Sequence, residues 1–224
     1  MGHTALRAAG LCGLVSMALL GSGCASTSYP EVSDDGLVRA ERTPNGAIYE
    51  ATDLDVHDYG QVVVDACTVS FRDDWQRDQN RNREPSRRVT TDDMQRIARE
   101  LGELCRETFA AELAEVTPGG GDASGNSGIL TVRPAIVDLD IAAPDLQTPG
   151  MERTYVTSAG QMTLDLELVD TSSRRVVGRV IDRRQAMHTP SPRRATVVSN
   201  RNEAKLILGQ WAAMVREYLE TSAE

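Results

Sequence analysis

The sequence of 224 residues lacks the short motifs that identify most hydrolases and redox proteins. It has no His-Glu-x-x-His, no Gly-x-Ser-x-Gly and no Cys-x-x-Cys, the common signatures of zinc proteases, serine hydrolases and thioredoxin-like proteins. The glycine-rich stretch 119–128 has no Lys-Ser/Thr ending and no helix after it, which excludes a phosphate-binding loop. Lone carboxylate pairs such as Asp73 with Asp74 and Asp138 with Asp140 are common in loops and strands. We predict no catalytic residue, no cofactor and no enzymatic activity.

The sequence is also poor in positive charge. It has 24 basic against 33 acidic residues, and Lys205 is the single lysine among the basic ones. Removal of residues 1–23 would take away only Arg7, which leaves 23 basic and 33 acidic residues and a net charge of −10. Nucleic acid and anionic lipid surfaces are poor partners for such a chain, so we predict no nucleic-acid binding.

No apolar run is long enough to span a bilayer as a helix. The uncharged segment Ala8 to Leu20 has 13 residues, whereas a membrane-spanning helix needs about 20. Preceded by Arg7 and followed by Gly21-Ser22-Gly23-Cys24-Ala25, it is typical of a bacterial lipoprotein signal peptide over residues 1–23. Gly21 departs from the pattern, because Leu, Val or Ile is usual three residues before the cysteine. The alternatives are an ordinary signal peptide or an uncleaved anchor.

Cys24 is therefore the predicted lipidation site and the new N-terminus of the exported protein. Its acyl chains would anchor the chain durably, because each buried methylene contributes about 0.8 kcal/mol. Ala25 and Ser26 follow it, with no Asp at the position that bacterial sorting commonly reads as an inner-membrane retention signal. We expect a protein anchored through lipid to the periplasmic face of the outer membrane.

Two parts are predicted after the signal peptide. Residues 24–50 are expected to be the lipidated N-terminus and a flexible tether, because residues 25–47 show no lasting apolar period. A flexible coil of about 22 residues has an r.m.s. span of about 26 Å. Residues 51–224 are expected to form one periplasmic α/β domain, since the 40% apolar content of the chain is ordinary for a globular protein.

The apolar periodicity predicts a sheet with helices. Strands are expected at 62–71, at 129–141, where Pro134 marks an edge or a bulge, and in an antiparallel hairpin of 162–168 with 176–185. Helices are expected from the N-cap Thr90, with Asp93 completing a capping box, to Val116, and again over the stripe from Ala204 to Leu219. In the last helix, Trp211 and Tyr218 are expected to pack in the core. We predict an α+β fold, a two-layer α/β sandwich whose mostly antiparallel sheet carries two amphipathic helices on one face.

Cys67 and Cys105 are the two thiols that remain in the exported chain besides Cys24. In an oxidising compartment they are a possible disulfide worth about 3–4 kcal/mol. The alternative is two separate buried thiols, and the sequence leaves both open. A zinc site with His57 and His188 lacks any short ligand spacing, so we predict no metal site.

The segment 72–90 is rich in Arg, Asp and Asn around the lone Trp75. Such a charge run is typical of a solvated loop. The functional alternative is a partner-binding loop in which Trp75 is the apolar anchor.

The order of the predicted elements, together with Cys24, resembles the bacterial lipoprotein family labelled domain of unknown function 3313. The resemblance lies in residues 53–65, where Tyr59 leads into the first strand, in 164–170 with 180–184, and in 211–216. Ser172-Ser173 stands in the hairpin turn where the family often has Thr-Gly. The resemblance implies an envelope location and this architecture, and it carries over no catalytic residue.

Two interpretations of function follow. The first is a noncatalytic binding or structural lipoprotein of the cell envelope, with an envelope protein or the cell wall as its partner. The alternative is a periplasmic hydrolase or small-ligand-binding protein with a site built from loops 72–90 and 186–199, where convergent polar groups would line a pocket.

Overall fold

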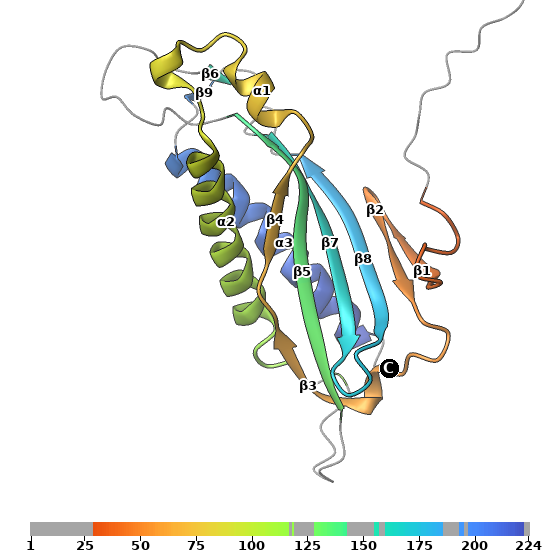
Figure 1. Cartoon of the computed structure of the whole chain (residues 1–224). Helices are drawn as coiled ribbons and strands as arrows, with labels where there is room; N and C mark the ends of the chain where they lie inside the picture. The colour runs from red at the N-terminus through yellow and green to blue at the C-terminus, as the bar shows by residue number, and fades with distance from the viewer. Residues whose placement is uncertain are drawn as a thin grey trace, which may run out of the picture.

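The fold consists of one sheet and one layer of helices. The computed structural model describes residues 29–116, 118, 128–142, 155–156, 160–185, 193–194 and 197–221. Within them, helices α2 (Thr91–Glu112) and α3 (Val197–Thr221) cover one face of a seven-stranded sheet (Figure 1). The predicted α+β two-layer sandwich with a mostly antiparallel sheet is confirmed. None of the described helices is long and apolar enough to cross a bilayer.

The strands of the sheet follow the order β1-β2-β8-β7-β5-β3, and β4 pairs with the second half of β5. Their bounds are β1 Val38–Thr43, β2 Gly46–Glu50, β3 Tyr59–Val64, β4 Thr68–Phe71, β5 Gly128–Ile141, β7 Gly160–Asp170 and β8 Val176–Gln185. Only β3 and β4 run parallel to their neighbour β5. The smaller elements are α1 Trp75–Asn80, the 3-10 turns η1 Val56–Asp58 and η2 Pro85–Arg87, and the two-residue pair β6 Tyr155–Val156 with β9 Arg193–Arg194.

The core lies between the sheet and the two long helices. Its fully buried large side chains come from the long strands and from both helices or their ends, namely Phe109, Leu113, Leu130, Ile136, Leu139, Leu164, Leu166, Leu168, Leu208 and Trp211. The alternation along β7 explains this placement, because every second residue of a strand points to the same face. Tyr218 is also buried in this cluster, so the interpretation of Trp211 and Tyr218 as core residues is confirmed.

The predicted hairpin of β7 and β8 is confirmed, and Asp170 holds its turn. One Asp170 carboxylate oxygen accepts hydrogen bonds from the Ser172 hydroxyl (2.6 Å) and from the Ser173 N–H (2.6 Å). These bonds stabilise the ionised form and hold the pKa of Asp170 well below its usual range. The side chain thereby replaces backbone partners that a tight turn leaves unpaired.

Helix α2 begins and packs as its sequence predicts. The Thr90 side chain accepts from the N–H of Asp93, and the Asp93 side chain accepts from the N–H of Thr90, so the capping box is confirmed. On the sheet side of the helix, a Cβ atom at Gly102 would stand 2.6 Å from the Cys67 carbonyl oxygen. Glycine at this position lets the helix backbone approach the chain between β3 and β4.

The predicted single strand 62–71 is divided, because residues 65–67 leave the ladder between β3 and β4. The division lies opposite Pro134, which pairs with β7 on its other side. Asp65 donates its N–H to the Val132 carbonyl. Residues two apart on a strand direct their backbone groups to the same side, so those of Pro134 also point toward β3 and β4. Proline has no N–H to offer there. Pro134 lies on an interior strand, and three residues, 65–67, stand opposite Arg133 and Pro134 between the two ladders. The interpretation of Pro134 as the mark of a bulge therefore agrees with the structure.

The prediction of a flexible tether up to residue 50 is wrong for the part that the structure describes. Residues 38–50 form the hairpin β1–β2, which extends the sheet beside β8. Thr43 pairs with Gly46 across a two-residue turn, and a Cβ atom at Gly46 would stand 1.8 Å from the Ile181 carbonyl oxygen. Only glycine fits where the hairpin joins β8.

The face of the sheet that carries no helix, called here the open face, is partly covered by residues 29–37. Leu37, Ala47 and Tyr49 form a small buried cluster there, with Ile181 packed against it. Ala47 and Tyr49 alternate with Ile48, which belongs to the core under the helices. The N-terminal segment therefore packs on the side opposite α2 and α3.

Candidate functional site

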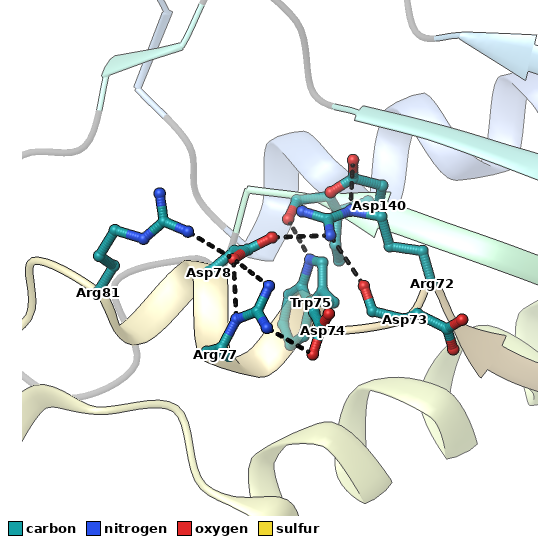
Figure 2. Close-up of polar contacts among 9 residues, drawn as sticks. Arg72, Asp73, Asp74, Trp75, Arg77, Asp78, Arg81 and Asp140 are labelled. Carbon is teal, nitrogen blue, oxygen red and sulfur yellow. Dashed lines mark hydrogen bonds and ion pairs between the residues drawn. The ribbon is translucent and has the colours of Figure 1, made fainter.

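Polar side chains from three elements meet at the end of the sheet where β4 and β5 terminate. Arg72 follows β4, Asp140 lies near the end of β5, and Asp78 belongs to α1 (Figure 2). Arg72 Nη1 lies 2.9 Å from Asp78 Oδ2, and Arg72 Nε lies 2.9 Å from Asp140 Oδ2. One guanidinium thus binds two carboxylates that are far apart in the sequence and fixes α1 to the sheet.

Further ion pairs surround this group. Arg77 Nη1 lies 3.0 Å from Asp74 Oδ1, and Arg81 Nη2 lies 3.2 Å from Asp78 Oδ1 (Figure 2). The hydrogen bond from Arg72 holds the pKa of Asp78 below its usual value. Arginine keeps its proton throughout the physiological range, so the arginines of this group serve as fixed positive charges. The cluster orders the segment by ion pairing across three parts of the chain.

Trp75 does not lie in a solvated loop, and its predicted role as an exposed partner contact is wrong. The side chain is 1% exposed and packs with Val89, Phe71 and Ile141. Its Nε1–H donates to the Ile141 carbonyl (2.8 Å), and its ring centroid lies 4.3 Å from that of Phe71. Trp75 is the centre of a small second core that seals the end of the sheet.

Backbone bonds at Val89 close this small core from the other side. Asn80 Oδ1 accepts from the Val89 N–H (2.7 Å), while Asn80 Nδ2 and Gln76 Nε2 both donate to the Val89 carbonyl (2.9 and 3.0 Å). The polar residues around Trp75 therefore satisfy backbone groups that α1 and η2 leave free. The segment 72–90 is a folded cap on the sheet.

The second predicted loop, 186–199, lies mostly outside the described residues, as does His188. The structure describes it at β9, which pairs with β6, and at the first turn of α3. Just beyond it, Asn200 Nδ2 donates to the Ala142 carbonyl (3.1 Å), so α3 begins beside the end of β5. The start of α3 thus lies at the same end of the sheet as the cap.

Cys67 and Cys105 form a disulfide, with their Cα atoms 6.1 Å apart. The bond joins the chain between β3 and β4 to the middle of α2, next to Gly102. It therefore fastens the helical layer to the edge of the sheet. Cys24, the predicted lipidation site, lies outside the described residues.

Over the described part of the chain, no three His, Cys, Asp or Glu side chains are grouped so that they could hold a metal ion. His57 lies exposed in η1, where its backbone N–H donates to Asp55 Oδ1 (2.9 Å).

Asp182 is the residue that the sequence analysis missed. It is 0% exposed, yet it accepts from Trp211 Nε1 (2.7 Å), Arg184 Nε (2.8 Å) and Thr43 Oγ1 (2.6 Å). These partners fasten α3 and the hairpin β1–β2 to β8. The signal was available, because Asp182 follows Val180 by two residues and so points to the same buried face.

Tyr59 and Asp170 meet at the opposite end of the sheet. Tyr59 is buried and its hydroxyl donates to the Asp170 carboxylate; burial, with the nearby negative charge, raises the pKa of Tyr59 to about 12. Arg175 binds Asp53 next to them with two hydrogen bonds of 3.0 and 2.9 Å. This cluster joins the start of β3 to the β7–β8 turn and explains why a tyrosine stands at the first residue of β3.

Comparison with known proteins identifies a family. The family model described as "Protein of unknown function (DUF3313)" matches residues 29–215. No curated protein matches the chain.

Two solved structures match the chain at low similarity. One is the PelC dodecamer from Paraburkholderia phytofirmans, at 11% identity and a TM-score of 0.33, over 73% of this chain and 93% of that chain. The other is a candidate lipoprotein from Caulobacter crescentus CB15, at 13% identity and a TM-score of 0.33, over 75% of this chain and 90% of that chain. Likeness at this level carries no conclusion about function.

Proposed function

We propose that this chain, which belongs to the DUF3313 family of proteins of unknown function, is a lipid-anchored protein of the bacterial cell envelope that acts by binding. The observation that carries the proposal is the position of Cys24. It ends an uncharged signal-like segment and stands only five residues before Tyr29, which packs against the cluster of Leu37, Ala47 and Tyr49. A membrane anchor and a folded domain are thus directly adjacent in the sequence.

The outer membrane is the proposed location. Ala25 and Ser26 follow Cys24, and neither is the acidic residue that commonly retains lipoproteins in the inner membrane. The Cys67–Cys105 disulfide supports export, because such bonds persist in the oxidising periplasm and are rare in the cytosol.

Binding is favoured over catalysis by the character of the polar clusters. Arg72 is shared between Asp78 and Asp140, and Arg175 is bound to Asp53. Each group is an ion pair that links two parts of the fold, which is what a rigid scaffold requires. We propose an envelope protein or the cell wall as the partner.

Metabolic labelling with palmitate tests the anchor. Cys24→Ala should abolish incorporation of labelled palmitate and release the chain from the membrane fraction. Cys12→Ala is the matched control, because it removes the other cysteine of the N-terminal segment and should leave labelling intact. Unchanged labelling of the Cys24→Ala protein would contradict the proposal.

Crosslinking in living cells tests the binding role. The acylated protein should form a discrete crosslinked species that mass spectrometry identifies as an envelope protein or as peptidoglycan. Hydrolytic turnover by the purified protein with no such species would favour an enzyme instead.

A further inference from the structure

Tyr29 and Pro30 are part of the folded domain. The Tyr29 hydroxyl donates to the Asn45 carbonyl (2.9 Å), and the Tyr49 hydroxyl donates to the Pro30 carbonyl (3.1 Å). Arg39 Nη1 also donates to the carbonyls of Tyr29 and Pro30. Tyr29 and Pro30 are thus held to the β1–β2 hairpin through both backbone and side chain.

This attachment lies on the open face of the sheet. Tyr29 packs against the cluster of Leu37, Ala47 and Tyr49, which is on the side opposite α2 and α3. Farther along the segment, Asp35 pairs with Arg179 of β8, whose guanidinium also binds Asp165 of β7 (2.7 Å). The segment 29–37 is therefore held across several strands of that face.

The connection from Cys24 to this point is short. Five Cα–Cα steps separate Cys24 from Tyr29, so the two Cα atoms can be at most about 18 Å apart. The distance across the sheet, from a residue on the open face to the outer side of the helical layer, is about 20 Å. It follows from the usual spacing of packed layers and the diameter of a helix. The connection is too short to lead round the sheet edge and past the helices.

We propose that the open face around residues 29–45 is the surface that lies against the phospholipid bilayer, and that the helical layer of α2 and α3 faces away from it. The proposal rests on the proposed acylation of Cys24. It makes the outer sides of the two helices, and not the open face, the surface available to a partner in the periplasm.

The acyl chains and not headgroup charge hold this face to the bilayer. Residues 29–45 contain four acidic side chains, Glu31, Asp34, Asp35 and Glu41, and two basic ones, Arg39 and Arg42. An acidic surface is not attracted to anionic lipid. Phosphatidylcholine vesicles, which carry no net charge, therefore test the orientation without repulsion between this face and the headgroups.

Lipid photocrosslinking with the acylated full chain in phosphatidylcholine vesicles tests the orientation. A photoreactive benzoylphenylalanine replaces either Val32, beside the anchor, or Leu206 on α3, two large apolar side chains of matched exposure at 53% and 50%. We expect a several-fold higher yield of lipid adducts from position 32. Equal yields, or a higher yield from position 206, would overturn the proposal.

A second pair of positions controls for an effect that is specific to one substitution. Asp34 and Glu103 are both exposed acidic residues, the first in the N-terminal segment and the second on α2. The probe at 34 should again give the higher yield of lipid adducts.

A longer connection tests the cause. About 20 Gly and Ser residues inserted between Ser28 and Tyr29 allow an r.m.s. span of about 25 Å and should abolish the difference between positions 32 and 206. A difference that persists would show that the short connection is not the cause. Palmitate labelling of every variant separates the two proposals, since unlabelled protein contradicts acylation, whereas labelled protein with equal yields contradicts only the orientation.

Discussion

The two faces of the sheet are made by alternate residues of the same strands, yet different forces hold them. On the face under α2 and α3, Leu164, Leu166 and Leu168 are fully buried among apolar side chains. On the open face, Glu167 pairs with Arg133 (3.0 Å), and Asp165 binds Arg179 through two hydrogen bonds. Burial of apolar area therefore provides most of the stability on the helical face, while the open face combines a small apolar cluster around Tyr49 with partly exposed ion pairs that contribute less.

Trp75→Ala should cause the largest loss of stability. The substitution empties the small core at the margin of the helical face and leaves the Ile141 carbonyl without its donor, so we expect a loss of about 4 kcal/mol. Urea unfolding of the protein in detergent, followed by circular dichroism, measures it. A loss below about 1 kcal/mol would show that the cap on the sheet is not a structural unit.

Removal of the disulfide should come next. Replacing both Cys67 and Cys105 by Ser frees the helical layer from the sheet edge, and we expect a loss of about 3–4 kcal/mol. The comparison is with wild type before and after reduction by dithiothreitol, which should weaken only the wild-type protein. Non-reducing mass spectrometry of wild type should first show the linked peptide, and free thiols at both positions would contradict the bond.

Leu166→Ala and Glu167→Ala compare the faces at neighbouring positions of one strand. Leu166→Ala leaves a cavity under the helices and should cost about 3 kcal/mol. Glu167→Ala removes an exposed partner of Arg133 and should cost less than about 1 kcal/mol. Similar losses from the same unfolding measurement would show that the open face around Glu167 contributes as much to stability as the helical face.

High pH should lower the stability of the folded protein through ionisation of Tyr59, which is buried on the helical face. Its pKa is raised from about 10 in the unfolded chain to about 12 in the folded one, so the folded state favours the neutral phenol. The resulting stability is complete below about pH 10 and is lost as the pH rises toward about 12, by about 1–2 kcal/mol. Tyr59→Phe should flatten this part of the curve of unfolding free energy against pH, and an identical slope in wild type and variant would contradict the assignment.

Arg179→Gln on the open face should also have a small effect. Its pairs with Asp165 and Asp35 are partly exposed, so we expect a loss of less than about 1 kcal/mol that shrinks further as salt is raised to about 1 M. A loss that is large and independent of salt would show that the network is buried in solution. Thermal melts at two salt concentrations decide between these results.

The sequence was sufficient to predict secondary structure where local signals agreed with the burial of each residue. Thr90 and Asp93 mark the start of α2, Asp170 marks the hairpin turn, and the leucines of β7 alternate as a half-buried strand requires. Each of these signals lies within a few residues, so no knowledge of distant partners was needed. The overall α+β architecture followed from them.

The sequence misled where distant partners decide. Trp75 stands among charged residues, but Phe71 and Ile141 bury it and the charges pair with one another. The β1–β2 hairpin was missed although Pro44 and Asn45, which form its turn, are common turn residues, because its strands are short and β1 is charged. Whether Cys67 and Cys105 pair depends on how closely α2 approaches the sheet, which no local pattern reveals.

The irregular outer strands also protect the protein from self-association. An unpaired sheet edge can add a strand from another copy and so begin aggregation. On one side, residues 65–67 interrupt the edge between β3 and β4. On the other side, β1 has a bulge between Arg39 and Glu41, and the Arg39 N–H already donates to the Glu31 carbonyl. Neither edge offers a long regular ladder, so copies of this protein can be crowded on a surface without joining edge to edge into fibres.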